Sequence, residues 1–138
     1  MPRIRRAVID TNVLVYDLVE DSMHHADASR LLDELDEWVI PVIVVHELVW
    51  VLRALNVPSW EALPLVRQYT SSAKAVVVGV ELGDVVNALR SLASEKLTLS
   101  RYNDKVILSV AYRLKLSVAS FDKRLRGQAR RLGLQVLP

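Results

Sequence analysis

Acidic residues follow two of the short apolar runs that the sequence predicts to be strands. Asp10 comes directly after the run at residues 7–9, and Asp122 comes shortly after the run at residues 117–119. Sites in open parallel sheets form beyond the carboxyl ends of the strands, so both aspartates are candidates for chemistry. Each aspartate could instead cap a helix, because a helical segment is expected after each of them.

Glu47 is surrounded by apolar neighbours if its segment is helical. The residues three and four positions away from it are Ile43, Val44, Trp50 and Val51. Burying a lone carboxylate is costly, so Glu47 needs a cation, a hydrogen bond or a cleft. The alternative is an exposed glutamate on a helix whose apolar face packs in an oligomer. The adjacent His46 is more typical of an ordinary core or surface histidine than of a metal ligand.

Asp104 lies in the first turn of a predicted helix, where the helix dipole favours a negative charge whatever its function. The set of four acids carries more weight than any single one. Two of them at strand ends and two on helices could converge at one edge of the sheet. There their charges would raise one another's pKa unless a divalent cation neutralised them. With no cysteine in the chain, oxygen ligands would select Mg²⁺ or Mn²⁺, ions that suit hydrolysis of phosphate bonds.

Short β-branched runs alternate along the chain with longer segments of helical period. Strands are expected at residues 7–9, 39–40, 75–78, 117–119 and 134–137, and helices at 26–35, 42–55, 81–94, 104–115, from Ser59 and from Lys123. Strands separated by helices imply βαβ units. The predicted fold class is therefore α/β, with a mostly parallel central sheet and helices on both of its faces.

The apolar pattern of the helices also predicts which side chains are buried. The helix at 42–55 is apolar nearly all round and is expected to be central, with Pro41 in its first turn. Ser59 is expected to cap a weaker helix that contains Pro64. The residues expected to face inward are Ala28, Leu31, Leu32 and Leu35; Leu82, Val85, Val86 and Leu89; and Val106, Ile107, Val110, Ala111 and Leu114.

Length and composition predict one domain over residues 1–138. Hydrophobic residues make up 51% of the 138 residues, and a mean hydropathy of +0.22 excludes a disordered chain. The first ten residues have no apolar stretch typical of a signal peptide. The longest apolar run, residues 39–52, is too short and too polar to span a bilayer. We therefore expect a cytoplasmic protein that does not contact a membrane.

Charge is distributed unevenly between the two halves of the chain. Residues 1–69 hold 6 basic and 11 acidic side chains, whereas residues 70–138 hold 12 basic and 5 acidic ones. On the last predicted helix, Lys123, Arg126 and Arg130 form one stripe, which we interpret as a hypothetical RNA phosphate contact. A solvated basic helix is the alternative.

Taken in order, these segments resemble the PIN-domain family, and in size the chain most resembles the VapC-type ribonuclease toxins of prokaryotic toxin–antitoxin pairs. The segments that carry the resemblance are residues 8–14, 24–28, 46–48, 103–108 with Ala111, and 120–125. Each motif is short and degenerate, but their order and spacing match nearly end to end. The resemblance implies a PIN-like three-layer α/β/α fold.

The resemblance also implies a site and a reaction. The family's metal-binding acids correspond to Asp10, Glu47, Asp104 and Asp122, with Thr11, Asn12 and Ser120 as supporting residues. Family members cleave RNA phosphodiester bonds with Mg²⁺ or Mn²⁺. The toxins are usually homodimers that a cognate VapB-type antitoxin neutralises. In the implied mechanism three aspartates hold metal, while Glu47 holds metal or orients the attacking water.

Two other functions remain open at this stage. A PIN-domain nuclease that processes ribosomal or other RNA would carry the same acids. A non-catalytic RNA-binding module would use them only as helix caps and surface groups. Phosphatases of the haloacid dehalogenase type are disfavoured, because they need an aspartate where this chain has Asn12.

Overall fold

A five-stranded sheet forms the centre of the structure, a computed structural model that describes residues 3–138. Met1 and Pro2 of the domain expected over residues 1–138 lie outside the described residues. The strands lie in the order β3-β2-β1-β4-β5, and every neighbouring pair is parallel. Their bounds are β1 Arg6–Ile9, β2 Glu37–Pro41, β3 Ala75–Val78, β4 Ser117–Ala119 and β5 Val136–Leu137.

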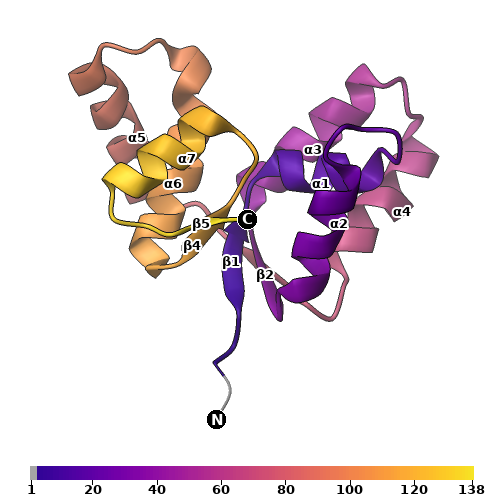
Figure 1. Ribbon diagram of the computed structural model, residues 1–138. Helices are drawn as coiled ribbons and strands as arrows, with labels where there is room; N and C mark the ends of the chain where they lie inside the picture. Colours follow the sequence, from indigo (N-terminus) through magenta and orange to yellow (C-terminus); the bar gives the residue numbers. More distant parts are fainter. Residues whose placement is uncertain (1–2) are drawn as a thin grey trace.

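Helices cover both faces of this sheet. Figure 1 shows the strands between one helical layer made by the first four helices and another made by the last three. The bounds are α1 Thr11–Leu18, α2 His25–Glu34, α3 Val42–Ala54, α4 Ser59–Thr70, α5 Leu82–Glu95, η1 Leu99–Arg101, α6 Tyr102–Leu114 and α7 Lys123–Arg131. The predicted three-layer α/β/α fold is therefore confirmed.

The inner strands are apolar on both faces because helices cover both. The side chains of β1 from Ala7 to Ile9 are fully buried, as are Val118 and Ala119 of β4. Leu14 of α1 and Leu48 of α3 belong to the same core cluster. This burial fixes the central strands, and with them the residues that follow their carboxyl ends.

The prediction that α3 is central is wrong. Only Val44, Leu48 and Leu52 of α3 are buried, at a spacing of four residues, while Val49 and Trp50 are exposed. The Arg53 guanidinium lies 5.4 Å from the centre of the Trp50 ring, so this aromatic side chain packs against a cation at the surface. The helix belongs to an outer layer and buries a single stripe.

The buried face predicted for α5 is also wrong. Of the four predicted residues, Leu82, Val86 and Leu89 are exposed and Val85 is half-buried, whereas the inward residues are Asp84, Ala88 and Leu92. The charged Asp84 faces inward because its carboxylate pairs with Arg113 of α6.

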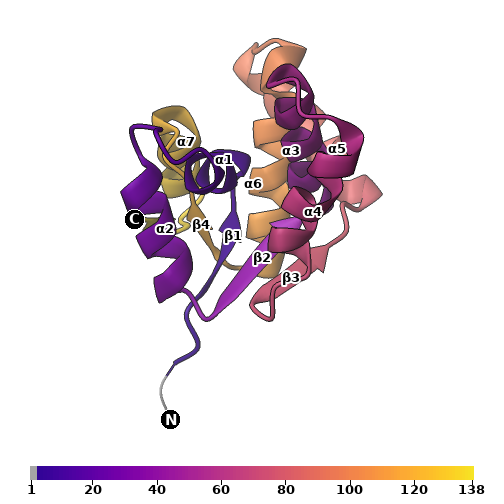
Figure 2. The same ribbon diagram turned by 90° about the vertical axis from the view of Figure 1, so that its right-hand side faces the viewer.

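Smaller differences concern helix ends. Pro41 ends β2 and stands before α3 rather than in its first turn, and Pro58 takes the capping position predicted for Ser59. The helix α4 nevertheless continues through Pro64. Figure 2 shows the sheet from the side, with the chain entering β1 at the lower edge. Over residues 3–138 the helices are all too short or too polar to cross a membrane.

Candidate metal centre at the carboxyl ends of β1 and β4

The two central strands, β1 and β4, are neighbours, and the chain leaves them in opposite directions across the sheet. Asp10 follows β1, and its backbone N–H donates to the carbonyl oxygen of Ala119 at 2.9 Å. Asp122 is the third residue after the end of β4. A reversal of strand order of this kind leaves a crevice at the carboxyl edge, where ligands bind in open α/β sheets.

The Ser120 hydroxyl joins the two strand ends. Ser120 is fully buried, and its Oγ donates to Asp10 Oδ2 at 2.7 Å. The same oxygen accepts from the Asp122 backbone N–H at 3.0 Å and from Asn12 Nδ2 at 3.3 Å. One donated and two accepted bonds use the whole capacity of a hydroxyl. Asn12 also accepts from the Phe121 N–H at 3.2 Å, so these side chains hold the two loops together.

Both aspartates cap helices, as the alternative interpretation predicted. Asp10 Oδ1 accepts from the Thr11 N–H at 2.8 Å, and Asp122 Oδ1 accepts from the Arg124 and Leu125 N–H groups. Capping does not exclude a second role, because Asp122 Oδ2 makes no hydrogen bond with a described residue. The caps fix the direction in which each carboxylate points.

Glu47 and Asp104 come from helices in the two different layers. Glu47 of α3 accepts a hydrogen bond at Oε1 from Thr11 Oγ1, at 2.8 Å. This bond ties α3 to the start of α1. It also gives the half-buried Glu47 carboxylate the hydrogen-bond partner that its apolar neighbours predicted. Asp104 stands in the first turn of α6 and is also half-buried.

Electrostatics couple the four acids through Asp10 and Asp104. Burial raises the pKa of Asp10 to about 7, with Asp104 and Glu47 adding to the rise, while the Ser120 hydroxyl opposes it. Burial likewise raises the pKa of Asp104, and the charges of Asp122 and Glu47 raise it further. Acids brought from β1, α3, α6 and the end of β4 therefore repel one another across a shared space.

One neighbour of this group was missed from the sequence. The positive charge of Arg101 in η1 lowers the pKa of Asp104, as does that of Lys105. Within residues 3–138 the Arg101 Nε is buried and has no hydrogen-bond partner. Its position three residues before Asp104, at helical spacing, is the signal that could have found it.

The donor set has the chemistry of a hard divalent cation site. The potential ligands here are carboxylate and hydroxyl oxygens, and a cation among them would relieve the repulsion that adds to the pKa values of Asp10 and Asp104. In the described part of the chain, however, no three acidic or histidine side chains stand close enough to enclose one ion. The acids fit Mg²⁺ or Mn²⁺ by type and charge, and they would have to draw closer around it.

The basic stripe predicted on α7 divides into two parts. Arg126 donates from Nη1 to the carbonyl oxygens of Ser120 and Leu137, and from Nη2 to that of Pro138. These bonds tie α7 to the ends of β4 and β5, so Arg126 has a structural task. Lys123 and Arg130 are exposed, and phosphate contact by them stays a prediction.

Comparison with known proteins gives the family. The sequence pattern of the PIN domain matches residues 7–131. No curated protein sequence matches the chain. Among solved structures, the VapC20 toxin of Mycobacterium tuberculosis, which cleaves the sarcin-ricin loop, is similar with a TM-score of 0.75 at 16% identity. That alignment covers 88% of this chain and 94% of VapC20.

Two further solved structures are similar as well. VapBC2 of Rickettsia felis, bound to a DNA fragment from its promoter, matches with a TM-score of 0.68 at 15% identity, covering 96% of this chain and 97% of that one. FitAcB of Neisseria gonorrhoeae matches with a TM-score of 0.67 at 17% identity, covering 96% of both chains. At these identities the solved structures establish the fold, and the sequence pattern establishes the family: the chain belongs to the PIN-domain family.

Proposed function

We propose that this protein is a Mg²⁺- or Mn²⁺-dependent endoribonuclease that hydrolyses RNA phosphodiester bonds as the toxin of a VapBC-type pair in the cytoplasm. What supports the proposal is the crowding of carboxylates at the carboxyl edge of a PIN domain, where Asp104 and Glu47 raise the pKa of Asp10, and Asp122 and Glu47 raise that of Asp104. A protein gains nothing in stability from gathering like charges unless a ligand of opposite charge compensates them.

Asp10, Asp104 and Asp122 would hold the ion, with Glu47 as a further ligand or as the residue that orients water. When bound, the ion would polarise the phosphoryl oxygen and lower the pKa of a bound water. Glu47 Oε2 makes no hydrogen bond with a described residue, so it can accept one from the attacking water. Thr11 and Ser120 keep the carboxylates of Glu47 and Asp10 in fixed directions. In-line attack on phosphorus then breaks one P–O ester bond of the RNA.

The structural neighbours support an antitoxin partner. Several of them are toxin–antitoxin assemblies, including a complex from Klebsiella pneumoniae with a TM-score of 0.62 at 17% identity. We propose that a VapB-type protein binds this chain in the same way. A homodimer is proposed as well, because α3 and α4 expose Trp50, Trp60 and Leu63. Analytical ultracentrifugation checks the dimer, and a Trp60→Ser variant should sediment as a monomer.

The test of the proposed function is cleavage of a labelled structured RNA in Mn²⁺ and in EDTA. The wild type should cut in Mn²⁺ only. Asp122→Asn should not cut, although asparagine is as good a helix cap as aspartate and should keep the fold. Asp21→Asn, an exposed acid in a turn, is the matched control and should cut like the wild type. Equal cutting by Asp122→Asn, or cutting in EDTA, would contradict the proposal.

A further inference from the structure

A groove runs along the outer side of α6, between α5 and α7, with a volume of about 500 Å³. Its floor consists of Lys105, Leu108, Ser109 and Tyr112, which lie on one face of α6 at helical spacing. Lys105 directly follows Asp104, so the groove begins beside the candidate metal centre. It contains none of the four acids and is therefore a separate feature.

The walls of this groove carry two arginines that pair with no acid among the described residues. Arg90 of α5 and Arg131 of α7 line opposite sides, are exposed, and form no ion pair with any residue between 3 and 138. Buried Lys105 pairs with Glu95, the one acidic residue of the lining. Asn87, Ser91 and Gln128 add neutral hydrogen-bonding groups. The groove thus has two cations free for an anion.

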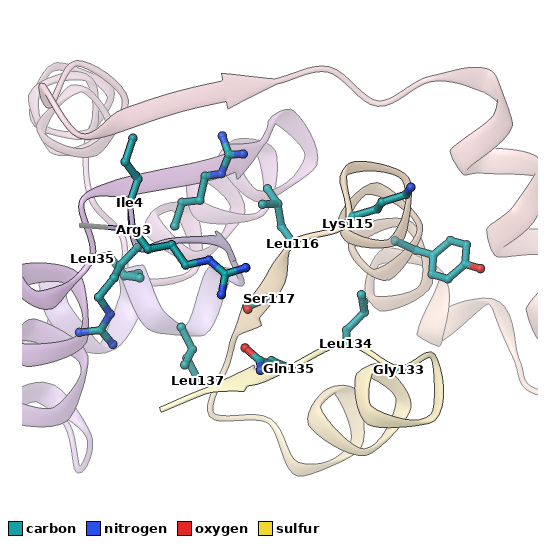
Figure 3. Close-up of a pocket in the computed structure, with 13 residues that line it drawn as sticks. Arg3, Ile4, Leu35, Lys115, Leu116, Ser117, Gly133, Leu134, Gln135 and Leu137 are labelled. Carbon is teal, nitrogen blue, oxygen red and sulfur yellow. The ribbon is translucent and has the colours of Figure 1, made fainter. Parts of the chain in front are cut away.

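A second depression, of about 980 Å³, lies at the opposite edge of the sheet from the acids. Figure 3 shows its lining, with Arg3 on one side and Ser117 and Gln135 on the other, and with Leu116 and Leu134 among its apolar side chains. Arg3, Arg5, Arg6 and Lys115 line it, and its lining contains no acidic residue. Arg5 and Arg6 have glutamates at 4.0 and 3.8 Å, whereas Arg3 and Lys115 form no ion pair within the described chain.

Tyr112 joins the two depressions. It lines both of them and is 60% exposed, although it is a large aromatic side chain. The 13 residues of α6 between Tyr102 and Leu114 span about 20 Å. The two depressions therefore meet at this exposed ring, and together they carry arginines and lysines from the groove beside α6 to the amino-terminal edge of the sheet.

We propose that this surface, the α6 track, binds a single-stranded stretch of the RNA substrate away from the bond that is cut. In this proposal Arg90 and Arg131 contact phosphates, and Tyr112 stacks on a base. Lys115 and Arg3 extend the contact to the amino-terminal edge of the sheet. Cations that alternate with an exposed aromatic ring suit single-stranded nucleic acid, whose backbone is charged and whose bases stack. The proposal rests on the proposed function, since it takes RNA to be the substrate.

The test is binding of two labelled RNAs, one of 4 and one of about 16 nucleotides, by fluorescence anisotropy in EDTA, where no cutting occurs. The full chain is compared with Arg90→Glu/Arg131→Glu, with Tyr112→Leu, and with the matched control Arg30→Glu/Arg67→Glu, whose arginines are exposed on α2 and α4. The double variant Arg90→Glu/Arg131→Glu should bind the long RNA at least about tenfold more weakly. The slope of its log affinity against log salt concentration should correspond to about two fewer phosphate contacts. Tyr112→Leu should lose about tenfold without a change in salt dependence.

The control variant should bind the long RNA as the wild type does. Equal binding by the track variants and the wild type would overturn the proposal, and so would an equal loss in the control. An acidic protein segment as the true occupant would appear as unchanged RNA binding in the track variants.

Cleavage by the wild type is measured separately in Mn²⁺. If the wild type cuts RNA but the track variants bind it normally, the proposed nuclease function stands and the α6 track is rejected. A track-dependent binding loss without cutting by the wild type would reject the nuclease and retain the track. Thermal unfolding of each variant checks that it is folded.

Discussion

Two buried aspartates of this protein sit in opposite electrostatic surroundings. Asp84 of α5 is 1% exposed and Asp10 is 6% exposed. Arg113 donates to both Asp84 oxygens, Ser109 donates to one of them, and the Glu81 backbone N–H donates to the other. Burial alone would raise the pKa of Asp84, but these donors hold it below its usual value. Asp10 has two donors and two carboxylates nearby but no cation among residues 3–138, and its pKa is raised.

The difference separates a structural carboxylate from one that awaits a ligand. The chain itself supplies the counter-ion of Asp84, which is Arg113 on the next helix. This ion pair holds α5 against α6 without a bound ligand. It supplies none of comparable strength to Asp10, which makes the acid site costly until a cation from solution enters. The variants below act on one aspartate and spare the other.

The largest expected effect is on cleavage. Asp10→Asn should lower the rate in Mn²⁺ by about 10³-fold, because it removes a charge that would bind the ion, worth several kcal/mol in the transition state. Asp84→Asn should retain most of the rate, since Asp84 is held by Arg113 away from the acids. Single-turnover cleavage of one RNA by both variants measures this. An equal loss in the two would remove the distinction.

The free energy of unfolding should respond mainly to changes at the Asp84–Arg113 pair. Arg113→Leu leaves Asp84 buried without its cation and should lower the free energy of unfolding by about 3 kcal/mol. Asp10→Asn should leave it unchanged or raise it in metal-free buffer, because it removes a repulsive charge. Urea denaturation at pH 7.5 gives both values. A loss in Asp10→Asn as large as in Arg113→Leu would show that Asp10 is structural.

The pH dependence of stability should also distinguish the two. The folded pKa of Asp10, about 7, lies above the ordinary value of 3.8, so the folded state holds a proton that the unfolded state loses. In EDTA this group should therefore lower stability by up to about 1.4 kcal/mol per unit as the pH rises from 4 to 7. Asp84 acts in the reverse direction, with a contribution lost only as the pH falls below 3.8. The difference in free energy of unfolding between the wild type and Asp10→Asn should therefore change steadily between pH 4 and 7. A difference that does not change with pH would contradict a raised pKa for Asp10.

The smallest effect concerns two serine hydroxyls. Ser120→Ala removes the donor to Asp10 Oδ2 and should weaken Mn²⁺ binding by about tenfold, as second-sphere changes at metal sites do. Ser109→Ala removes the matching donor to Asp84 Oδ1 and should leave Mn²⁺ binding unchanged. Isothermal titration of both variants measures the affinities, and the reverse order would place the ion elsewhere.

The sequence predicted the order of the elements well because the strands are short apolar runs between helical periods. It also predicted that Asp10 and Asp122 each follow the end of a strand, and both do. That these two strands are neighbours emerged only from the structure. The burial of α5 could not be predicted, because helical periodicity treats Asp84 as a surface residue. Its partner Arg113 lies 29 residues away on α6, and a pairing between helices leaves no local pattern.

Contacts within the site were only partly accessible from sequence. Ser120 stood out as a supporting residue, but its bonds to Asp10, Asn12 and the Asp122 backbone depend on how β1 and β4 pair. Arg126 seemed equivalent to Lys123 on a basic stripe, yet its guanidinium binds carbonyls at the strand ends. Helical spacing predicts on which face of α7 a side chain lies, but not which backbone carbonyls of other segments it can reach.

Thermal unfolding with and without Mn²⁺ at pH 7.5 tests the central claim, that the acids hold a divalent cation, most directly. The account predicts that saturating Mn²⁺ raises the midpoint of the wild type and of Asp84→Asn by several degrees, because the ion binds only the folded state. The double variant Asp10→Asn/Asp104→Asn should show no such rise. An unchanged midpoint in the wild type, or an equal rise in the double variant, would contradict the account.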